Sequence, residues 1–369
     1  MKFLVYGLSN GWGGVEAIVM GMVSRLCKEH SFDILLSEGD CNYASRYDNK
    51  TIRFLHVPAW GSNRMGFKNG IVSILKQDSY DYVWINACLM SNRDIISVVK
   101  KHSSAKIITH SHGSSFEEDN QVKRMILMGM HYLNRSYYHH HTDYPCMCSR
   151  KSGEWYYGKS YMNTHDVYYI KNGVDVSRYS FKEDVRSEYR NQLGLTDELA
   201  LFHAGRLTYV KNQRFILDIC AEMKKRGNNF KLFIAGEGEL YSELIEHVAS
   251  LTIGKEVVFL GNRSDVDKLY QAMDVFLLPS HHEGFPVTLA EAQASGIRCI
   301  VSDHVSVETN LTGLVNYLPI DKGVKPWADL ISSYTFDSQN RVEMADAVIN
   351  SGYDINDVCK QFVKHISKS

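Results

Sequence analysis

The feature that most constrains the fold is the alternation of short apolar runs with longer amphipathic stretches along the whole chain. This rhythm is typical of strand–helix–strand units, which build a parallel sheet with helices on its faces. It starts at the first residues and restarts near residue 199. At 369 residues, the chain is also longer than one ordinary hydrophobic core requires. The sequence therefore predicts two α/β domains in succession.

The apolar runs give the expected strands, and the amphipathic stretches give the helices between them. The expected strands are Phe3–Tyr6, Phe32–Leu36, Ile52–His56, Tyr82–Ile85, Lys106–Thr109, Pro145–Cys148, Val167–Ile170, Leu199–Ala204, Lys231–Ala235, Glu256–Leu260, Val275–Leu278 and Arg298–Ser302. The expected helices include Val15–Cys27, Ile71–Lys76, Gln213–Arg226, Tyr241–Leu251, Ser264–Ala272 and Thr288–Ser295. The turn dipeptide Asn172-Gly173 ends the first set, which predicts a first domain at 1–173 and a second from 174.

Composition excludes several classes of protein. The 41 basic and 42 acidic side chains leave a net charge of -1, which argues against nucleic acid as the main partner. The eight cysteines contain no CxxC pair, so we expect reduced thiols. The first residues are too short an apolar run for a signal peptide, and no stretch approaches the roughly 20 apolar residues of a membrane span. We therefore expect a cytoplasmic protein. The run His139–His141 is not expected to bind a metal, because adjacent residues do not face one ion.

The segment Pro279–Ala292 carries two carboxylates at a predicted strand-to-helix junction. Pro286 is tolerated in a first helical turn but not inside a helix, so the helix should begin near it. Glu283 then lies in the loop and Glu291 lies within the helix. The backbone N–H groups around Gly284–Thr288 would face an anion beyond the strand ends. Because carboxylates repel phosphates, Glu283 and Glu291 are expected to accept hydrogen bonds from hydroxyl groups of a sugar and a ribose.

A second segment, His203–Asn212, supplies positive charge after another expected strand. Arg206 offers a planar fork for phosphate oxygens, and Lys211 offers a mobile point charge. Two fixed cations would neutralise a leaving diphosphate without Mg²⁺. The alternative is that both are solvated loop charges, as most surface Arg and Lys side chains are.

These segments belong to a larger set of motifs in a fixed order. The others are Cys148-Ser149 with Tyr157-Gly158, Asn172–Asp175, Ala235–Gly238 and Phe259–Gly261. Together they resemble the family 4 retaining glycosyltransferases, which are common in bacterial capsule and exopolysaccharide synthesis. The resemblance implies the GT-B fold, in which two Rossmann-like doubly wound domains face each other across a cleft. It assigns acceptor binding to 1–173, nucleotide-sugar binding to 174–352, and a helix that crosses back to the first domain to 353–369.

The resemblance also implies roles for individual residues. Arg206 and Lys211 would contact the donor diphosphate, Glu291 the ribose hydroxyls, and Glu283 the donor sugar. This makes Glu283 a candidate catalytic residue. The other donor-binding residues implied are Gly261, Arg263, Gly284, Phe285, Pro286, Val287 and Thr288, with Gly13 and Gly14 of the first-domain glycine loop. For that glycine loop, a tight strand-to-helix turn without a ligand is the alternative.

The segment Thr109–Ser115 follows an expected strand and contains two histidines. In the family a histidine here lies near the reacting sugar, and His112 fits that place better than His110. A neutral imidazole there would orient a sugar or the acceptor, whereas an ordinary structural histidine is the alternative. The first-domain motifs contain no second carboxylate for a double displacement. We therefore expect front-face attack, with the leaving phosphate helping to take the acceptor proton.

The expected activity is retaining, metal-independent transfer of a hexose-type sugar from a nucleotide diphosphate-sugar, with UDP favoured and no cofactor. The expected acceptor is a lipid-linked intermediate or an oligosaccharide in bacterial surface polysaccharide synthesis. A GT-B nucleotide-sugar epimerase and a non-catalytic GT-B subunit remain alternatives. A dehydrogenase is disfavoured, because the sequence lacks the glycine fingerprint of dinucleotide-binding enzymes. The segment Gln121–Tyr138 is expected to form a helix that either faces the core or rests on anionic lipid. Peripheral membrane contact is thus an open alternative.

Overall fold

The structure, a computed structural model, describes residues 1–113, 120–334 and 338–368. It divides into two compact units. The first contains Met1–Gly173 and the segment that begins at Ile355, and the second contains Val174–Asp354. The chain thus leaves the first unit directly after the Asn172-Gly173 turn and returns to it at Ile355.

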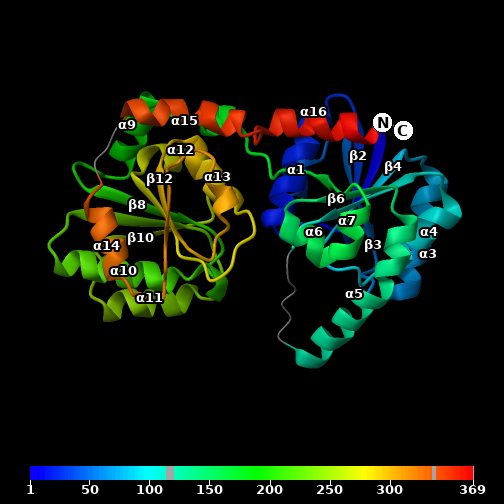
Figure 1. Ribbon diagram of the computed structural model, residues 1–369, viewed down its shortest axis with the longest axis horizontal. Helices are drawn as coiled ribbons and strands as arrows, with labels where there is room; N and C mark the ends of the chain where they lie inside the picture. The colour runs from blue at the N-terminus through cyan, green and yellow to red at the C-terminus, as the bar shows by residue number, and fades with distance from the viewer. Residues whose placement is uncertain (114–119, 335–337, 369) are drawn as a thin grey trace. The chain divides into compact units, whose positions relative to one another are not determined.

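The first unit is built on a parallel seven-stranded sheet in the order β3-β2-β1-β4-β5-β6-β7 (Figure 1). The strands are β1 (Lys2–Tyr6), β2 (Ser31–Ser37), β3 (Ile52–Val57), β4 (Tyr82–Ala87), β5 (Lys106–Ser111), β6 (Tyr144–Met147) and β7 (Tyr168–Tyr169). The helices of Met1–Gly173 are α1 (Gly14–Leu26), α2 (Ala44–Tyr47), α3 (Arg64–Gln77), α4 (Asp94–His102), α5 (Gln121–His141), α6 (Arg150–Tyr156) and α7 (Lys159–Thr164). The strand order reverses between β1 and β4, which is where ligands bind in doubly wound sheets.

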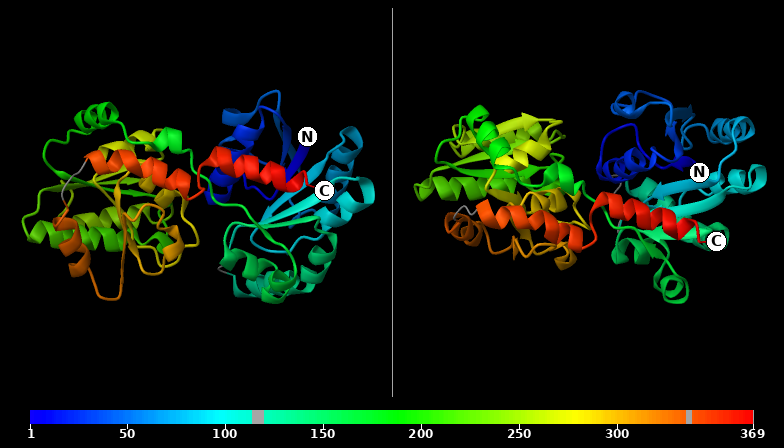
Figure 2. Two further views of the ribbon diagram at one scale, coloured as in Figure 1. Left: turned by 45° about the horizontal axis from the view of Figure 1, so that its top comes forward. Right: turned by 90° about the horizontal axis from the view of Figure 1, so that it is seen from above.

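Helix α16 (Ile355–Ile366) completes one face of this first sheet. It lies beside α1, as both views of Figure 2 show. Phe362 of α16 is fully buried and stacks on Trp84 of β4, with ring centroids 5.0 Å apart. The hydroxyl of Tyr82 donates to the carbonyl oxygen of Ile366 at 2.9 Å. The core of the first unit therefore includes residues that follow the whole second unit in sequence.

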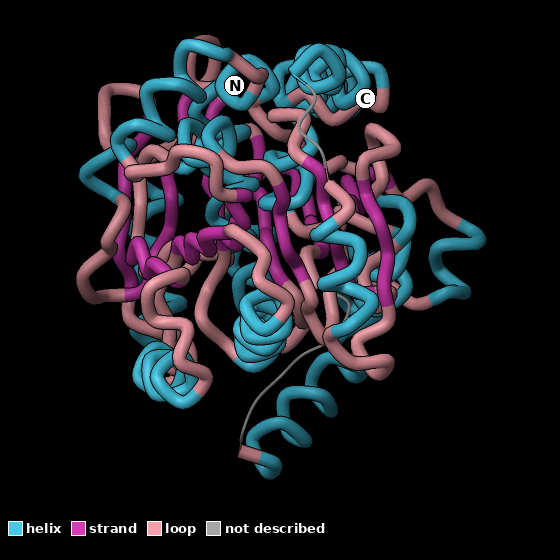
Figure 3. The backbone as a smooth tube through the Cα atoms, turned by 90° about the vertical axis from the view of Figure 1, so that its left-hand side faces the viewer, coloured by secondary structure: helices cyan, strands magenta, loops and turns pink. Residues whose placement is uncertain are grey.

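The second unit repeats the design with a parallel six-stranded sheet in the order β10-β9-β8-β11-β12-β13. In Figure 3, where this unit faces the viewer, its strands lie in a layer between helices. The strands are β8 (Leu199–Ala204), β9 (Phe230–Ala235), β10 (Val257–Gly261), β11 (Val275–Leu278), β12 (Arg298–Ser302) and β13 (Val315–Leu318). The helices are α8 (Val176–Tyr179), α9 (Glu183–Gln192), α10 (Gln213–Lys225), α11 (Tyr241–Ser250), α12 (Val266–Ala272), α13 (Val287–Ala294), α14 (Lys325–Ser332) and α15 (Ser338–Asn350), with short 3-10 turns η1 (Tyr209–Lys211) and η2 (Val307–Thr309). Here the order reverses between β8 and β11.

A fully buried arginine on α15 holds two helices of the second unit in place. The guanidinium of Arg341 donates to carbonyl oxygens at the end of α12 and to that of Ser295 after α13, at 2.9–3.2 Å. Gly296 makes this approach possible, because a Cβ there would lie 2.5 Å from the Arg341 Cα, and its φ is +66°. Carbonyls at helix ends lack partners within the helix. Arg341 therefore fixes the positions of α12 and α13 together.

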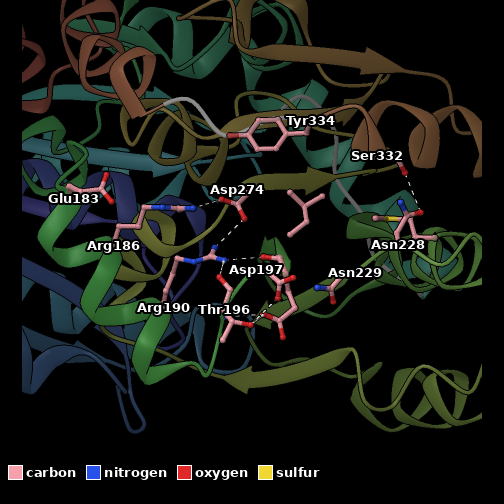
Figure 4. Close-up of a pocket in the computed structure, with 13 residues that line it drawn as sticks. Glu183, Arg186, Arg190, Thr196, Asp197, Asn228, Asn229, Asp274, Ser332 and Tyr334 are labelled. Atoms are coloured by element: carbon pink, nitrogen blue, oxygen red, sulfur yellow. Dashed lines mark hydrogen bonds and ion pairs between the residues drawn. The ribbon is translucent and has the colours of Figure 1, made fainter.

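A pocket of about 570 Å³ lies at the amino ends of β8 and β11 (Figure 4). Its polar groups mostly engage one another. Asp274 accepts from Arg186 at 2.6 Å, from Arg190 at 3.2 Å and from the backbone N–H of Ala200 at 2.8 Å. The network ties α9 to the sheet, at the strand ends opposite those that carry the candidate site.

Every expected strand is present, although β7 keeps only two residues, and β13 was not predicted. Helix α3 begins at Arg64, earlier than expected, because the side chain of Asn63 caps it. All eight cysteines are free thiols, as expected. The three adjacent histidines bond separately, His139 to Tyr157, His140 to Ser136 and His141 to Tyr137, through carbonyl oxygens.

Candidate active site

The candidate site in the second unit is formed by the loops that follow β8 and β11, the two strands at the reversal of strand order. The backbone N–H of His281 donates to the carbonyl oxygen of Val210 at 2.8 Å. The side-chain amide of Asn212 donates to the carbonyl oxygen of Pro279 at 3.1 Å. These bonds join the two segments that the sequence singled out for carboxylates and cations.

Lys211 and Glu283 meet at this junction. The Nζ of Lys211 lies 2.5 Å from Oε1 of Glu283, and the hydroxyl of Ser280 donates to the same oxygen at 2.9 Å. The side chain of Lys211 is only 22% exposed to solvent, and that of Glu283 only 12%. Charge-assisted hydrogen bonds of this kind are stronger than neutral ones. A cation and a loop carboxylate are thus held together, one turn before α13 begins.

Arg206 is placed differently from Lys211. Its side chain is 76% exposed, and its Nε lies 3.8 Å from Oε2 of Glu239, which is also exposed. Surface ion pairs of this kind fix a side chain weakly. The fold alone therefore does not fix the Arg206 side chain, and its contact with the donor diphosphate stays a prediction.

The start of α13 has the form expected of an anion site. Pro286 precedes the helix with φ −70°, and this end has no side-chain cap hydrogen bond. The first N–H groups of a helix lack partners within it and carry the positive end of its dipole. A Cβ at Gly284 would meet nothing within 4 Å, and the ring of Phe285 stacks on Tyr353 at 4.6 Å. Thr288 has a buried hydroxyl without a partner among the described residues.

Glu291 lies one turn into α13 and is held by two phenols. The hydroxyl of Tyr179 on α8 donates to its Oε1 at 2.8 Å, and that of Tyr270 on α12 donates to its Oε2 at 3.3 Å. Burial raises the pKa of Glu291 above its usual value, and the two phenols lower it. The carboxylate thus combines a desolvated position with two hydrogen-bond donors.

Glycine turns bring the neighbouring loops close to this region. Gly236 after β9 has φ +136°, and a Cβ there would lie 2.0 Å from the carbonyl oxygen of Gly205. Its N–H donates to the carbonyl oxygen of Gly261 at 2.8 Å. Arg263 makes two hydrogen bonds to Asp265, at 2.8 and 2.7 Å. The loop at Gly261–Arg263 therefore lies at the carboxyl end of the sheet, with its arginine already engaged.

His203 of β8 lies beneath these loops and gives the second unit a pH-dependent stability. Its Nδ1 donates to the carbonyl oxygen of Leu277 at 2.9 Å, and its Nε2 accepts from the Gln213 amide at 3.0 Å. Burial lowers its pKa from 6.5 to about 4. The unfolded state therefore binds the proton first as the pH falls. We expect the free energy of unfolding to decrease between pH 6.5 and pH 4, by roughly 3 kcal/mol from this residue.

Urea unfolding of the second unit at several pH values measures this effect. In His203→Gln the decrease over the same window should be smaller than in the parent chain by that amount, whatever the stability of the variant at pH 7. An equal decrease in both proteins would show that His203 is not the group that titrates.

The glycine loop of the first unit follows β1. Gly7 has φ +101°, and a Cβ there would lie 1.7 Å from the carbonyl oxygen of Asn86 at the end of β4. Glu16 in the first turn of α1 accepts from the backbone N–H of Ser9 at 2.7 Å. A Cβ at Gly13 would lie 2.9 Å from this carboxylate, whereas one at Gly14 would meet nothing within 4 Å. The loop is thus closely packed at its start and open at the beginning of α1.

His112 lies just after β5, and the structure places it beside the end of β4. Its Nε2 donates to Oδ1 of Asn86 at 2.9 Å, and its Nδ1 has no partner among the described residues. Burial lowers its pKa to about 3, so the imidazole is neutral at physiological pH. His110 is fully buried with its ring centroid 4.0 Å from that of His112, which favours a structural role for His110. Residues 114 and 115 of this predicted segment lie outside the described residues.

Sequence reasoning missed four side chains that shape these sites. Tyr179 and Tyr270 contact Glu291, Ser280 contacts Glu283, and Asn86 contacts His112. Ser280 lies within a segment already singled out, so its spacing of three from Glu283 was a usable signal. The two tyrosines and Asn86 come from distant segments, and no local pattern marks them. Within the described part of the chain, no cluster of three or more His, Cys, Asp or Glu side chains is arranged to hold a metal ion.

Comparisons with known proteins agree with this arrangement. The model of the family "Glycosyl transferases group 1" matches residues 185–350, which include the loops after β8 and β11 and helix α13. A Bacillus subtilis (strain 168) protein named as a glycosyltransferase, EpsF, is 28% identical over 350 residues, covering 93% of this chain and 90% of its own. The UDP-Gal:alpha-D-GlcNAc-diphosphoundecaprenol alpha-1,3-galactosyltransferase of Escherichia coli is 26% identical over 306 residues, covering 79% and 76%.

Among solved structures, Anabaena Alr3699/HepE in complex with UDP and glucose superimposes with a TM-score of 0.78 at 18% identity, over 100% of both chains. That likeness shows the GT-B fold, and the sequence matches above show the enzyme class. The GT-B fold explains the two Rossmann-like units, and the enzyme class explains the motif loops at the carboxyl ends of β8 and β11. The chain is a glycosyltransferase with the GT-B fold, and its residues 185–350 match the group 1 glycosyl transferases.

Proposed function

We propose that the chain transfers a hexose-type sugar from a UDP-sugar, with retention and without a metal ion, to a lipid-linked or oligosaccharide acceptor in bacterial surface polysaccharide synthesis. The observation that carries the proposal is the Lys211–Glu283 pair next to the uncapped start of α13. It combines a held cation, free helix N–H groups and a carboxylate within one loop junction. A sugar diphosphate presents the matching groups, which are two phosphates and a ring of hydroxyls.

Each residue then has a distinct task in the reaction. The donor diphosphate would take the place of Glu283 as the partner of Lys211, and the start of α13 would bind its remaining charge. Glu283, released from Lys211, would accept hydrogen bonds from hydroxyls of the donor sugar. Charge that develops on the leaving diphosphate is thereby stabilised by groups already in position. The leaving phosphate would take the acceptor proton during front-face attack, and the neutral imidazole of His112 would orient the sugar.

Two relatives support the choice of donor and acceptor. The HepE structure contains UDP and glucose, and the Escherichia coli relative is named for UDP-Gal and a diphosphoundecaprenol-linked sugar. For this chain we infer the same nucleotide and the same general class of acceptor.

A thermal-shift series with UDP, GDP and ADP tests the donor proposal. At 100 times its dissociation constant, the correct nucleotide should add about 2.7 kcal/mol of stability. We expect UDP to do so, with and without EDTA. Incubation with UDP-sugar alone should then yield no epimer, which distinguishes transfer from the epimerase alternative. A shift that appears only with a divalent ion would contradict metal independence.

We also propose that the enzyme contacts a membrane surface through α5. Its exposed apolar side chains are Val122, Met125, Ile126, Tyr132 and Leu133, with exposed fractions of 54–82%. With Gly129 they recur every three or four residues, so they form one stripe, which we call the outer stripe of α5. The buried residues His131, Asn134 and Tyr138 lie on the other side of the helix. The first half of α5 extends away from its unit (Figure 1), so the expectation of a helix with its apolar side in the core is wrong here.

The charge of the helix favours an anionic lipid surface as the partner. Helix α5 contains Lys123, Arg124 and Arg135 and no acidic side chain. Cationic amphipathic helices bind in the headgroup region with their apolar face buried. Among the described residues, no helix is both long enough and apolar enough to cross a bilayer.

Flotation with vesicles of anionic and of zwitterionic lipid tests the outer stripe. We expect the chain to float with anionic vesicles, and the double variant Met125→Glu, Leu133→Glu to lose about 90% or more of that binding, because two buried apolar groups are replaced by charges. The matched control is Val307→Glu, Val342→Glu, which changes two exposed apolar residues of the second unit. Equal flotation of both double variants would exclude α5 as the contact.

A further inference from the structure

Glu291 is held on both of its oxygens by phenols from two other helices. Tyr179 donates to Oε1 at 2.8 Å, and the single hydroxyl proton of Tyr270 is shared between Oε2, at 3.3 Å, and the carbonyl oxygen of Thr288, at 3.0 Å. Tyr270 is fully buried and Tyr179 is 8% exposed. Their rings pack edge to face with centroids 5.8 Å apart. Glu291 itself keeps part of its surface accessible.

We propose that Tyr179 and Tyr270 are positioning residues that fix the Glu291 carboxylate as the acceptor for ribose hydroxyls and so determine selection of ribonucleotide donors. The inference rests on the proposed function, because it assumes a nucleotide donor at α13. A carboxylate has about four lone-pair directions. Two phenol donors leave the others for a ligand, and they prevent the side chain from rotating away when the ligand leaves.

The surroundings explain why two donors are needed. Burial raises the pKa of Glu291, and the phenols lower it toward the ionised form. The other charged groups that act on it are Arg178, which lowers its pKa, and Asp267, which raises it. These two are paired with each other at 2.6 Å and act on the pKa of Glu291 in opposite directions. The phenols therefore carry most of the stabilisation of the ionised carboxylate, which is the form that accepts two hydroxyl protons.

The position of α8 makes Tyr179 the more informative of the two residues. Helix α8 begins at Val176, three residues after Gly173, and packs against α12 and α13. The tyrosine that orients the ribose acceptor is therefore contributed by the first segment of the second unit. Its hydroxyl can be removed by a Tyr→Phe substitution that keeps the ring packing.

The experiment compares the affinities of UDP and 2′,3′-dideoxy-UDP. In the parent chain we expect UDP to bind at least about 30-fold more tightly, since hydroxyl-to-carboxylate hydrogen bonds are among the stronger kind. In Tyr179→Phe and in Tyr270→Phe this ratio should fall about 5- to 10-fold, with dideoxy-UDP affinity within about twofold of the parent. The matched control is Tyr317→Phe, whose hydroxyl bonds Thr309 in the same unit at 3.0 Å, and its ratio should not change.

A pH series adds a measurement that a merely structural role would not affect. Without a phenol donor the pKa of Glu291 rises, so UDP affinity should begin to fall at a higher pH on acidification than in the parent. The affinity of dideoxy-UDP should show no such displacement, because that ligand lacks both hydroxyls. Melting temperatures of the variants show whether the unit remains folded.

The possible results separate this inference from the proposed function. An unchanged ratio in both tyrosine variants overturns the inference, while UDP binding that is lost in Lys211→Ala still supports the donor site. An unchanged ratio in Glu291→Gln overturns it as well, because the ribose then lies elsewhere. If the parent chain binds no nucleoside diphosphate, the proposed function fails and the inference fails with it.

Discussion

Replacing Lys211 by alanine is expected to lower kcat/KM for UDP-sugar by about 10²–10³-fold and to remove most of the stabilisation by UDP. The substitution removes a preorganised cation from the place where charge develops on the leaving diphosphate. It also leaves the Glu283 side chain, only 12% exposed, without its cationic partner. The loop that carries Glu283 therefore loses an ion pair that stabilises its conformation. The measurements are UDP affinity and the rate of UDP-sugar turnover.

Lys225→Ala is the matched control for this substitution. Lys225 lies in the last turn of α10 and is exposed, so the same loss of charge should change UDP affinity less than twofold. Glu283→Gln should reduce turnover while retaining UDP binding, because it preserves the cation and removes the acceptor of sugar hydroxyls. If Lys211→Ala and Lys225→Ala bind UDP equally well, the diphosphate site is not at the β8–β11 junction.

Replacing Gly7 by alanine is expected to destabilise the first unit by about 3–5 kcal/mol. The new Cβ would lie 1.7 Å from the carbonyl oxygen of Asn86, and the backbone at this position has φ +101°. Both the strand end and the loop must therefore shift. Since Asn86 also binds His112, the shift should reach the histidine. The measurement is the urea-unfolding transition of the first unit.

Gly129→Ala is the same chemical change, but we expect it to increase stability. Gly129 lies inside α5, and a Cβ there would meet nothing within 4 Å. Alanine is the better helix former by about 0.5–1 kcal/mol, so this variant should be more stable than the parent chain. A Gly7→Ala protein as stable as the parent would show that the β1 loop can relax away from β4.

The architecture and much of the second-unit site follow from sequence because they depend on local patterns. Parallel strands buried on both faces are continuous apolar runs, which is why Leu199–Ala204 and Val275–Leu278 were predicted with their observed bounds. The polar residues directly after such runs meet at one end of the sheet. The Lys211–Glu283 contact is a direct consequence, and Pro286 correctly marks the start of α13.

Features that depend on distant packing could not be predicted in this way. Strand β13 has four residues, three of them only partly buried, and is defined by its pairing with β12. The outer stripe of α5 has the periodicity of a core-facing helix, and only the folded unit shows that the stripe faces outward. Tyr179 reaches Glu291 across 112 positions of sequence. No local signal distinguishes it from the many other tyrosines of the chain.

Helix α16 has a consequence for synthesis on the ribosome. The second unit is one continuous stretch, whereas the first needs residues that follow it by roughly 180 positions. At translation rates of about 5–20 residues per second, on the order of 10–35 seconds pass between the synthesis of Gly173 and that of Ile355, where the helix begins whose Phe362 covers Trp84. The nascent first unit must therefore remain open, or be covered by a chaperone, while its downstream neighbour completes folding.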